Sequence, residues 1–101
     1  MTLETFRQSL HREEPPRQLS LALTGLWWDA KGDWKQAHDV VGQDEGPAAA
    51  WVHAYLHRKE GDLANSRYWY KRACKEPATA SLDAEWQEVT EALLAESDAS
   101  L

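Results

Sequence analysis

Apolar residues recur three or four positions apart along much of the chain, the spacing that places them on one face of an α-helix. Leu3, Phe6 and Leu10 follow this spacing near the N-terminus and predict a short helix over residues 2–13. The next apolar run, over residues 17–31, forms two stripes and leaves little polar surface. We expect this second helix at the centre of the molecule, with the first helix as a lid.

Glycine, aspartate and proline mark where the following helices begin and end. Gly32-Asp33 and Gly61-Asp62 each suit a tight turn between helices. Glycine adopts the left-handed conformation that ends one helix, and the aspartate carboxylate accepts the first free amides of the next. Pro47 fits the first turn of a helix. The four helices predicted after the first two span residues 33–41, 47–60, 62–75 and 81–96, and the residues after these are expected to fray.

No segment shows the sustained apolar and polar alternation that predicts a half-buried β-strand. The chain is therefore predicted to be all-α and, at 101 residues, to form a single domain. Six Trp, three Tyr and one Phe supply large apolar surfaces for one core.

The two Gly-Asp turns lie 29 residues apart and belong to a longer internal match. In this register Gly25 falls on Ala54, and Ala37 falls on Ser66. Small residues at matched positions favour close helix packing, because their side chains let two backbones approach each other. The match predicts two stacked antiparallel helical hairpins over about residues 17–77. The alternative is a helical bundle whose Gly-Asp turns coincide because good turns are few.

This pattern resembles the tetratricopeptide repeat, which combines a small residue in the first helix, a Gly-Asp-aromatic turn, and alanine and aromatic positions in the second helix. The second copy matches best, with Ala54, Gly61-Asp62-Leu63, Ser66, Tyr70, Ala73 and Pro77. The repeat is shorter here than the roughly 34 residues typical of the family. The chain also resembles small uncharacterised bacterial proteins built from short α-hairpin repeats. The resemblance implies that the N-terminal helix 2–13 and the acidic C-terminal helix 81–96 cap the two hairpins.

The same resemblance implies a protein-interaction module, because tetratricopeptide domains hold an extended peptide in a groove lined by the first helix of each hairpin. Carried over by position, the candidate groove residues are Leu26, Asp29, Ala30, Trp51, Tyr55, Arg58 and Lys59. Arg58 would contact a carboxylate of a protein or peptide partner, with aromatic side chains as apolar walls. In the alternative interpretation, Trp51 and Tyr55 are buried against the neighbouring hairpin, and Arg58 pairs with solvent or with the acidic tail.

Two histidines suggest a different function. His53 and His57 lie four residues apart on one predicted helix, which is the spacing of helical zinc ligands. Ala54 stands where a His-Glu-x-x-His hydrolase would have its glutamate, so that motif is absent. Cys74 or Asp29 would complete a site if the fold brought either near. A small metal-binding protein or metal-dependent enzyme, using zinc or iron, is therefore an alternative. In the other interpretation, His57 replaces the packing aromatic at its repeat position and His53 hydrogen-bonds a neighbouring helix.

The net charge of −6 is concentrated in residues 76–101, which contain seven acids and no Lys or Arg. This acidity argues against nucleic-acid binding, even though residues 58–75 are locally basic and mix bases with aromatics. We expect the acidic tail to dock on that basic segment.

No apolar run is long enough to cross a membrane, and no phosphate loop, dinucleotide fingerprint or nucleophile elbow is present. The single cysteine cannot form an internal disulfide and favours a reducing cytoplasm. The sequence therefore favours a non-enzymatic module in the cytoplasm, either a monomer or a homodimer. A further alternative is a homodimer with a structural role, in which exposed Trp residues pair across a two-fold axis.

Overall fold

The computed structural model describes residues 1–99, and these form six α-helices with no strand among them. The prediction of an all-α chain is confirmed. The helices are α1 (Leu3–Ser9), α2 (Leu21–Ala30), α3 (Trp34–Val41), α4 (Pro47–Glu60), α5 (Leu63–Ala73) and α6 (Leu82–Ala99). Helix α6 continues past the predicted end at residue 96. Ser100 and Leu101, which belong to the segment predicted to fray, lie outside the described residues.

The first two helices are shorter than predicted. Helix α1 ends at Ser9 because the amides of residues 10–12 bond to carbonyls three residues back, which tightens the chain into turns. Helix α2 begins at Leu21 instead of residue 17, because the Ser20 hydroxyl accepts the amide of Leu23 at 3.2 Å and caps the helix there.

Both predicted Gly-Asp turns are present and nearly identical. Gly32 and Gly61 adopt left-handed backbone conformations, with φ of 88° and 92°. The amide that follows each glycine donates to the carbonyl five residues back, that of Trp28 at 3.0 Å and that of His57 at 2.9 Å. These bonds satisfy carbonyls that a helix end otherwise leaves without partners.

The aspartates of these turns begin the next helices, as predicted. The Asp33 carboxylate accepts the amide of Gln36 at 3.0 Å, and the Asp62 carboxylate accepts the amide of Asn65 at 3.2 Å. Each aspartate therefore satisfies a free amide in the first turn of α3 or α5.

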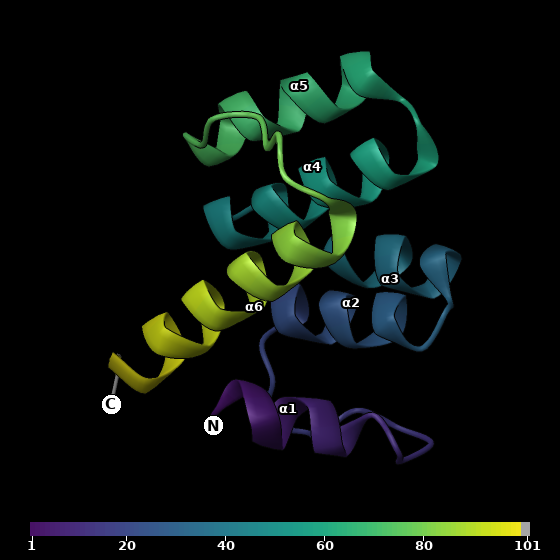
Figure 1. Cartoon of the computed structure of the whole chain (residues 1–101), viewed down its shortest axis with the longest axis vertical. Helices are drawn as coiled ribbons and strands as arrows, with labels where there is room; N and C mark the ends of the chain where they lie inside the picture. The colour runs from purple at the N-terminus through teal and green to yellow at the C-terminus, as the bar shows by residue number, and fades with distance from the viewer. Residues whose placement is uncertain (100–101) are drawn as a thin grey trace.

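The helices lie in chain order, with α6 across them. The most extensive contacts join α2 to α3 and α4 to α5, and the two Gly-Asp turns lie on the same side of the molecule (Figure 1). Helix α6 runs diagonally over α2 and α4 and also contacts α1 (Figure 1). The faces of α2 and α4 that point away from α3 and α5 are thus partly covered by the end of the chain.

Small residues permit a close approach within both helix pairs, as predicted. A Cβ atom on Gly25 would lie 2.4 Å from a methyl carbon of Val41, so α2 and α3 leave no room for a larger residue there. In the matched position of the second pair, the Ser66 hydroxyl donates to the carbonyl of Ala54 at 2.8 Å.

Tryptophan side chains tie both ends of the chain to α2. The indole of Trp27 is fully buried and donates to the Ser9 hydroxyl of α1 at 3.1 Å. Trp86 of α6 donates to the carbonyl of Leu26 at 3.1 Å. Within the described part of the chain, no helix has the length and apolarity needed to cross a membrane.

Candidate functional site

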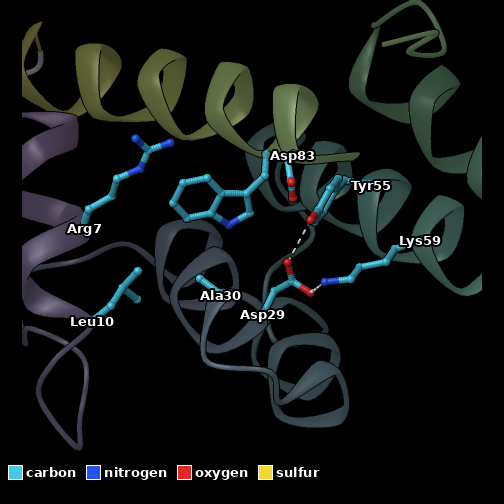
Figure 2. A pocket seen from close by; sticks show the side chains of 8 residues that line it. Arg7, Leu10, Asp29, Ala30, Tyr55, Lys59 and Asp83 are labelled. Atoms are coloured by element: carbon cyan, nitrogen blue, oxygen red, sulfur yellow. Dashed lines mark hydrogen bonds and ion pairs between the residues drawn. The ribbon is translucent and has the colours of Figure 1, made fainter. Parts of the chain in front are cut away.

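An open cleft of about 500 Å³ lies between α1, α2, α4 and α6 (Figure 2). Its lining residues are Arg7, Leu10, Asp29, Ala30, Tyr55, Lys59, Asp83 and Trp86. Four of these, Asp29, Ala30, Tyr55 and Lys59, are groove positions that the tetratricopeptide resemblance implies. The structure thus brings residues from α2 and α4 together in one depression.

Asp29 forms the centre of the cleft floor. Its side chain is only 2% exposed, and both carboxylate oxygens are bonded. The Tyr55 hydroxyl donates at 2.8 Å, and the Lys59 ammonium donates at 2.9 Å. Burial and the neighbouring Asp29 charge raise the pKa of Tyr55, so its hydroxyl stays protonated and keeps donating. This triad fixes α4 against α2.

The rim of the cleft carries both signs of charge. The Arg7 guanidinium lies 5.7 Å from the centre of the Trp86 ring and donates to the Gln87 side chain at 3.0 Å. Asp83 is exposed at the start of α6 (Figure 2). A ligand in the cleft would therefore meet a cation on α1, an acid on α6 and an apolar side chain, Leu10, between α1 and α2.

Leu26, Trp51 and Arg58 do not line this cleft. Leu26 is fully buried, and Trp51 packs beneath the Lys75 ammonium, 4.2 Å from its ring centre. The Arg58 guanidinium donates to Glu85 of α6 at 2.9 Å and to the carbonyl of Ala80. Arg58 is thus held by the acidic C-terminal segment, which is the alternative considered from the sequence.

Glu85 is a buried acid that the sequence reasoning missed. Its side chain is 1% exposed and accepts from Arg58 of α4 and from the hydroxyl of Tyr70 of α5. Burial, followed by the bond to Glu85, raises the pKa of Tyr70. The available signal was its position three residues after Leu82, on the predicted apolar face of the last helix.

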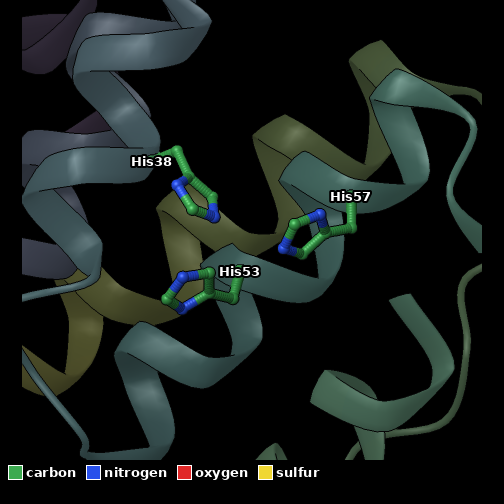
Figure 3. A group of neighbouring side chains, drawn as sticks. All are labelled: His38, His53 and His57. Atoms are coloured by element: carbon green, nitrogen blue, oxygen red, sulfur yellow. The ribbon is translucent and has the colours of Figure 1, made fainter. Parts of the chain in front are cut away.

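The second candidate site is a cluster of His38, His53 and His57. Each ring contributes one nitrogen, and these three nitrogens all lie within 4.8 Å of one another. Figure 3 shows the three rings facing one another, His38 from α3 and the other two from α4. The ring centres of His38 lie 5.0 Å from His53 and 5.1 Å from His57.

His38 was not among the metal ligands predicted from the sequence. The available signal was weak: His38 lies four residues after Trp34, and therefore on the same face of α3. Cys74 and Asp29, the residues considered as further ligands, do not join the cluster. Cys74 is exposed at the end of α5, and Asp29 is bonded to Tyr55 and Lys59.

Two tryptophans enclose the histidines. Trp34 stacks on His38 with ring centres 5.0 Å apart, and Trp69 stacks on His53 at 4.1 Å. Burial lowers the pKa of His53 to about 4, and the neighbouring histidines add to this effect. The pKa of His38 is also lowered, again mainly by burial. Both rings are therefore neutral at pH 7, which is the form of histidine that binds metals.

No family model, curated protein or solved structure matches this chain at a significant level. The geometry of its own residues is therefore the basis for a functional proposal.

Proposed function

We propose that this chain is a cytoplasmic protein-interaction module of tetratricopeptide type. In this proposal α2–α3 and α4–α5 are two stacked antiparallel hairpins, and α1 and α6 are their caps. The nearly identical turns at Gly32 and Gly61 and the matched small residues in both pairs support this interpretation.

The observation that carries the functional proposal is the composition of the cleft. Its floor comes from α2 and α4, the first helix of each proposed hairpin, through Asp29, Ala30, Tyr55 and Lys59. In a tetratricopeptide domain these helices line the peptide groove. Helix α6 fills the part of that groove around Arg58, so the partner would use the opening that remains between α1 and α6.

The size and chemistry of the opening favour a short peptide segment of a partner protein. A volume of about 500 Å³ is in the range of clefts that hold small ligands or a few peptide residues. Arg7 is exposed at the rim and suits an acidic side chain of the partner, while Leu10 offers apolar contact. The bonds of Asp29 keep the floor rigid, which limits the entropy lost on binding.

Site-specific photo-crosslinking in the native host tests this proposal. A photoreactive phenylalanine analogue would replace Ala30, which is exposed and lines the cleft, and in a matched control would replace Ala64, which is exposed on α5. We expect a discrete adduct from position 30 that is absent from position 64 and weaker when Arg7→Ala is added. An adduct pattern shared by both positions, or no adduct from position 30, would refute binding in the cleft.

A further inference from the structure

We infer that His38, His53 and His57 form a binding site for one divalent transition-metal ion, with Zn²⁺ as the preferred candidate. This inference goes beyond the proposed function, because peptide binding in the cleft requires no metal. The histidines lie outside the cleft and come from α3 and α4.

The spacing of the three rings fits a metal after a small adjustment. Zn–N bonds of about 2.0–2.1 Å place two ligand nitrogens roughly 3.3 Å apart in a tetrahedral site. The histidine nitrogens already lie within 4.8 Å of one another. Each would move toward the common centre by about 1 Å or less, which side-chain rotation supplies.

The Glu60 carboxylate contacts the His57 ring and orients it as a ligand. The Glu60 carboxylate lies 2.6 Å from Nδ1 of His57 and only accepts hydrogen bonds. In the neutral ring, this contact places the proton on Nδ1 and leaves the lone pair of Nε2 for a metal. A carboxylate behind a histidine fixes the ring and strengthens it as a metal ligand. Asn65 approaches Nε2 at 3.4 Å, so an ion would replace only a long and weak hydrogen bond.

His53 has unused bonding capacity. Its ring is 5% exposed, and its Nδ1 has no hydrogen-bond partner among the described residues. A buried polar atom without a partner is rare in folded proteins. Because no hydrogen bond at Nδ1 fixes the tautomer of this ring, either nitrogen can offer its lone pair to an ion.

The ligand set determines which ions are suitable. Three imidazole nitrogens suit Zn²⁺, Co²⁺, Ni²⁺ and Cu²⁺, whereas Mg²⁺ and Ca²⁺ prefer oxygen ligands. His38 is only partly buried, so a water molecule could reach the fourth coordination position from its side. Because His38 lies on α3 and the others on α4, a bound ion would cross-link the two helix pairs and stabilise the fold.

Titration of metal-free, untagged protein tests the inference. Calorimetry with ZnCl₂ should show one ion per chain, Zn²⁺ should raise the melting temperature, and Co²⁺ should give the intense visible absorption of a four-coordinate nitrogen site. Magnesium chloride serves as the ion control and should produce none of these changes.

Variants identify the ligands. We expect His38→Gln and His53→Gln each to weaken Zn²⁺ binding by more than about 100-fold, and Glu60→Gln by about 10- to 100-fold. His11→Gln is a matched control, since His11 is the remaining histidine and is exposed after α1. It should bind Zn²⁺ as the wild type does. If His53→Gln does not fold, the partly exposed His38 still provides the test.

Two outcomes would overturn the inference. One is a folded wild-type protein that shows no stoichiometric Zn²⁺ or Co²⁺ binding, which would leave the histidines as packing residues. The other is binding that persists unchanged in His38→Gln or disappears in His11→Gln. Neither outcome bears on the crosslinking experiment at position 30, so failure of the metal site and failure of the cleft can be distinguished.

Discussion

The Arg58 guanidinium and the Glu85 carboxylate form an ion pair of 2.9 Å that joins α4 to α6. Glu85 also accepts from Tyr70, so one buried acid holds groups from both helices of the α4–α5 pair. Removing this carboxylate would leave a partly buried cation and a buried hydroxyl without their partner.

We predict that Glu85→Ala lowers the free energy of unfolding by about 3 kcal/mol or more, because breaking a buried ion pair leaves an uncompensated charge. Urea denaturation measures the change. Glu88 is exposed and lies about one helical turn after Glu85 on α6. Glu88→Ala should therefore change the free energy of unfolding by less than about 0.5 kcal/mol. Equal effects of the two substitutions would mean that the ion pair contributes nothing specific.

The turn at Gly61 gives a second prediction. A Cβ at this position would meet nothing within 4 Å, so substitution acts only through the backbone φ of 92°. Gly61→Ala should therefore cost about 1–2 kcal/mol, and Gly61→Asn should cost less, because asparagine tolerates the left-handed conformation better. Thermal melting of the two variants checks this order. A reversed order would contradict backbone strain as the cause.

At Gly25 the cost of substitution comes from lack of space for a side chain, and not from the backbone conformation. Gly25→Ala would place Cβ 2.4 Å from Val41, and overpacking of this kind typically costs about 1–3 kcal/mol. The gain in helix propensity offsets up to about 1 kcal/mol, so we expect a net loss of roughly 1 kcal/mol. Val41→Ala should relieve the clash. In a double-mutant cycle, the pair should therefore cost less than the sum of the single changes. Simple additivity would argue against the close contact.

The buried tyrosines predict loss of stability at alkaline pH. The pKa values of Tyr55 and Tyr70 are raised above 10.0, mainly by burial. The next cause is the Asp29 charge for Tyr55 and the hydrogen bond to Glu85 for Tyr70. Their contribution to stability is fully present below pH 10, and it is lost as the pH rises further, because the unfolded chain then releases protons that the folded state retains.

Urea denaturation at about pH 8 and about pH 11 measures this loss. Tyr70→Phe should reduce the dependence on pH, since one of the two groups is removed. Tyr68→Phe, at a side chain that is 53% exposed, is the matched control and should retain the wild-type slope. Identical slopes for all three proteins would exclude Tyr70 as a source of the effect.

Local chemistry explains which features could be predicted from the sequence. The Gly-Asp turns were found because each turn depends on two adjacent residues whose conformational preferences are known. The roles of His38 and Glu85 were missed because they depend on how α3 is rotated toward α4 and where α6 docks. Those relations arise from packing between distant segments, which the spacing of apolar residues does not specify.

The cleft also combines features that were predicted from the sequence with features that only the packing of distant segments determines. The match between the two segments placed Asp29 and Tyr55 on related helices, but it left open whether Arg58 lines the groove or pairs with the acidic tail, and the structure pairs it with Glu85. The early end of α1 was also missed. The spacing of apolar residues does not show where the backbone amides begin to bond to carbonyls three residues back instead of four.

The bond between the Trp86 indole and the carbonyl of Leu26 connects groups 60 residues apart. During synthesis on the ribosome, α2 through α5 emerge before the segment that covers them. The apolar faces of α2 and α4 therefore remain open to chaperones or to other nascent chains until α6 has also emerged. Premature termination before Trp86 would leave these faces exposed permanently, so truncated products should be prone to aggregation and rapid proteolysis.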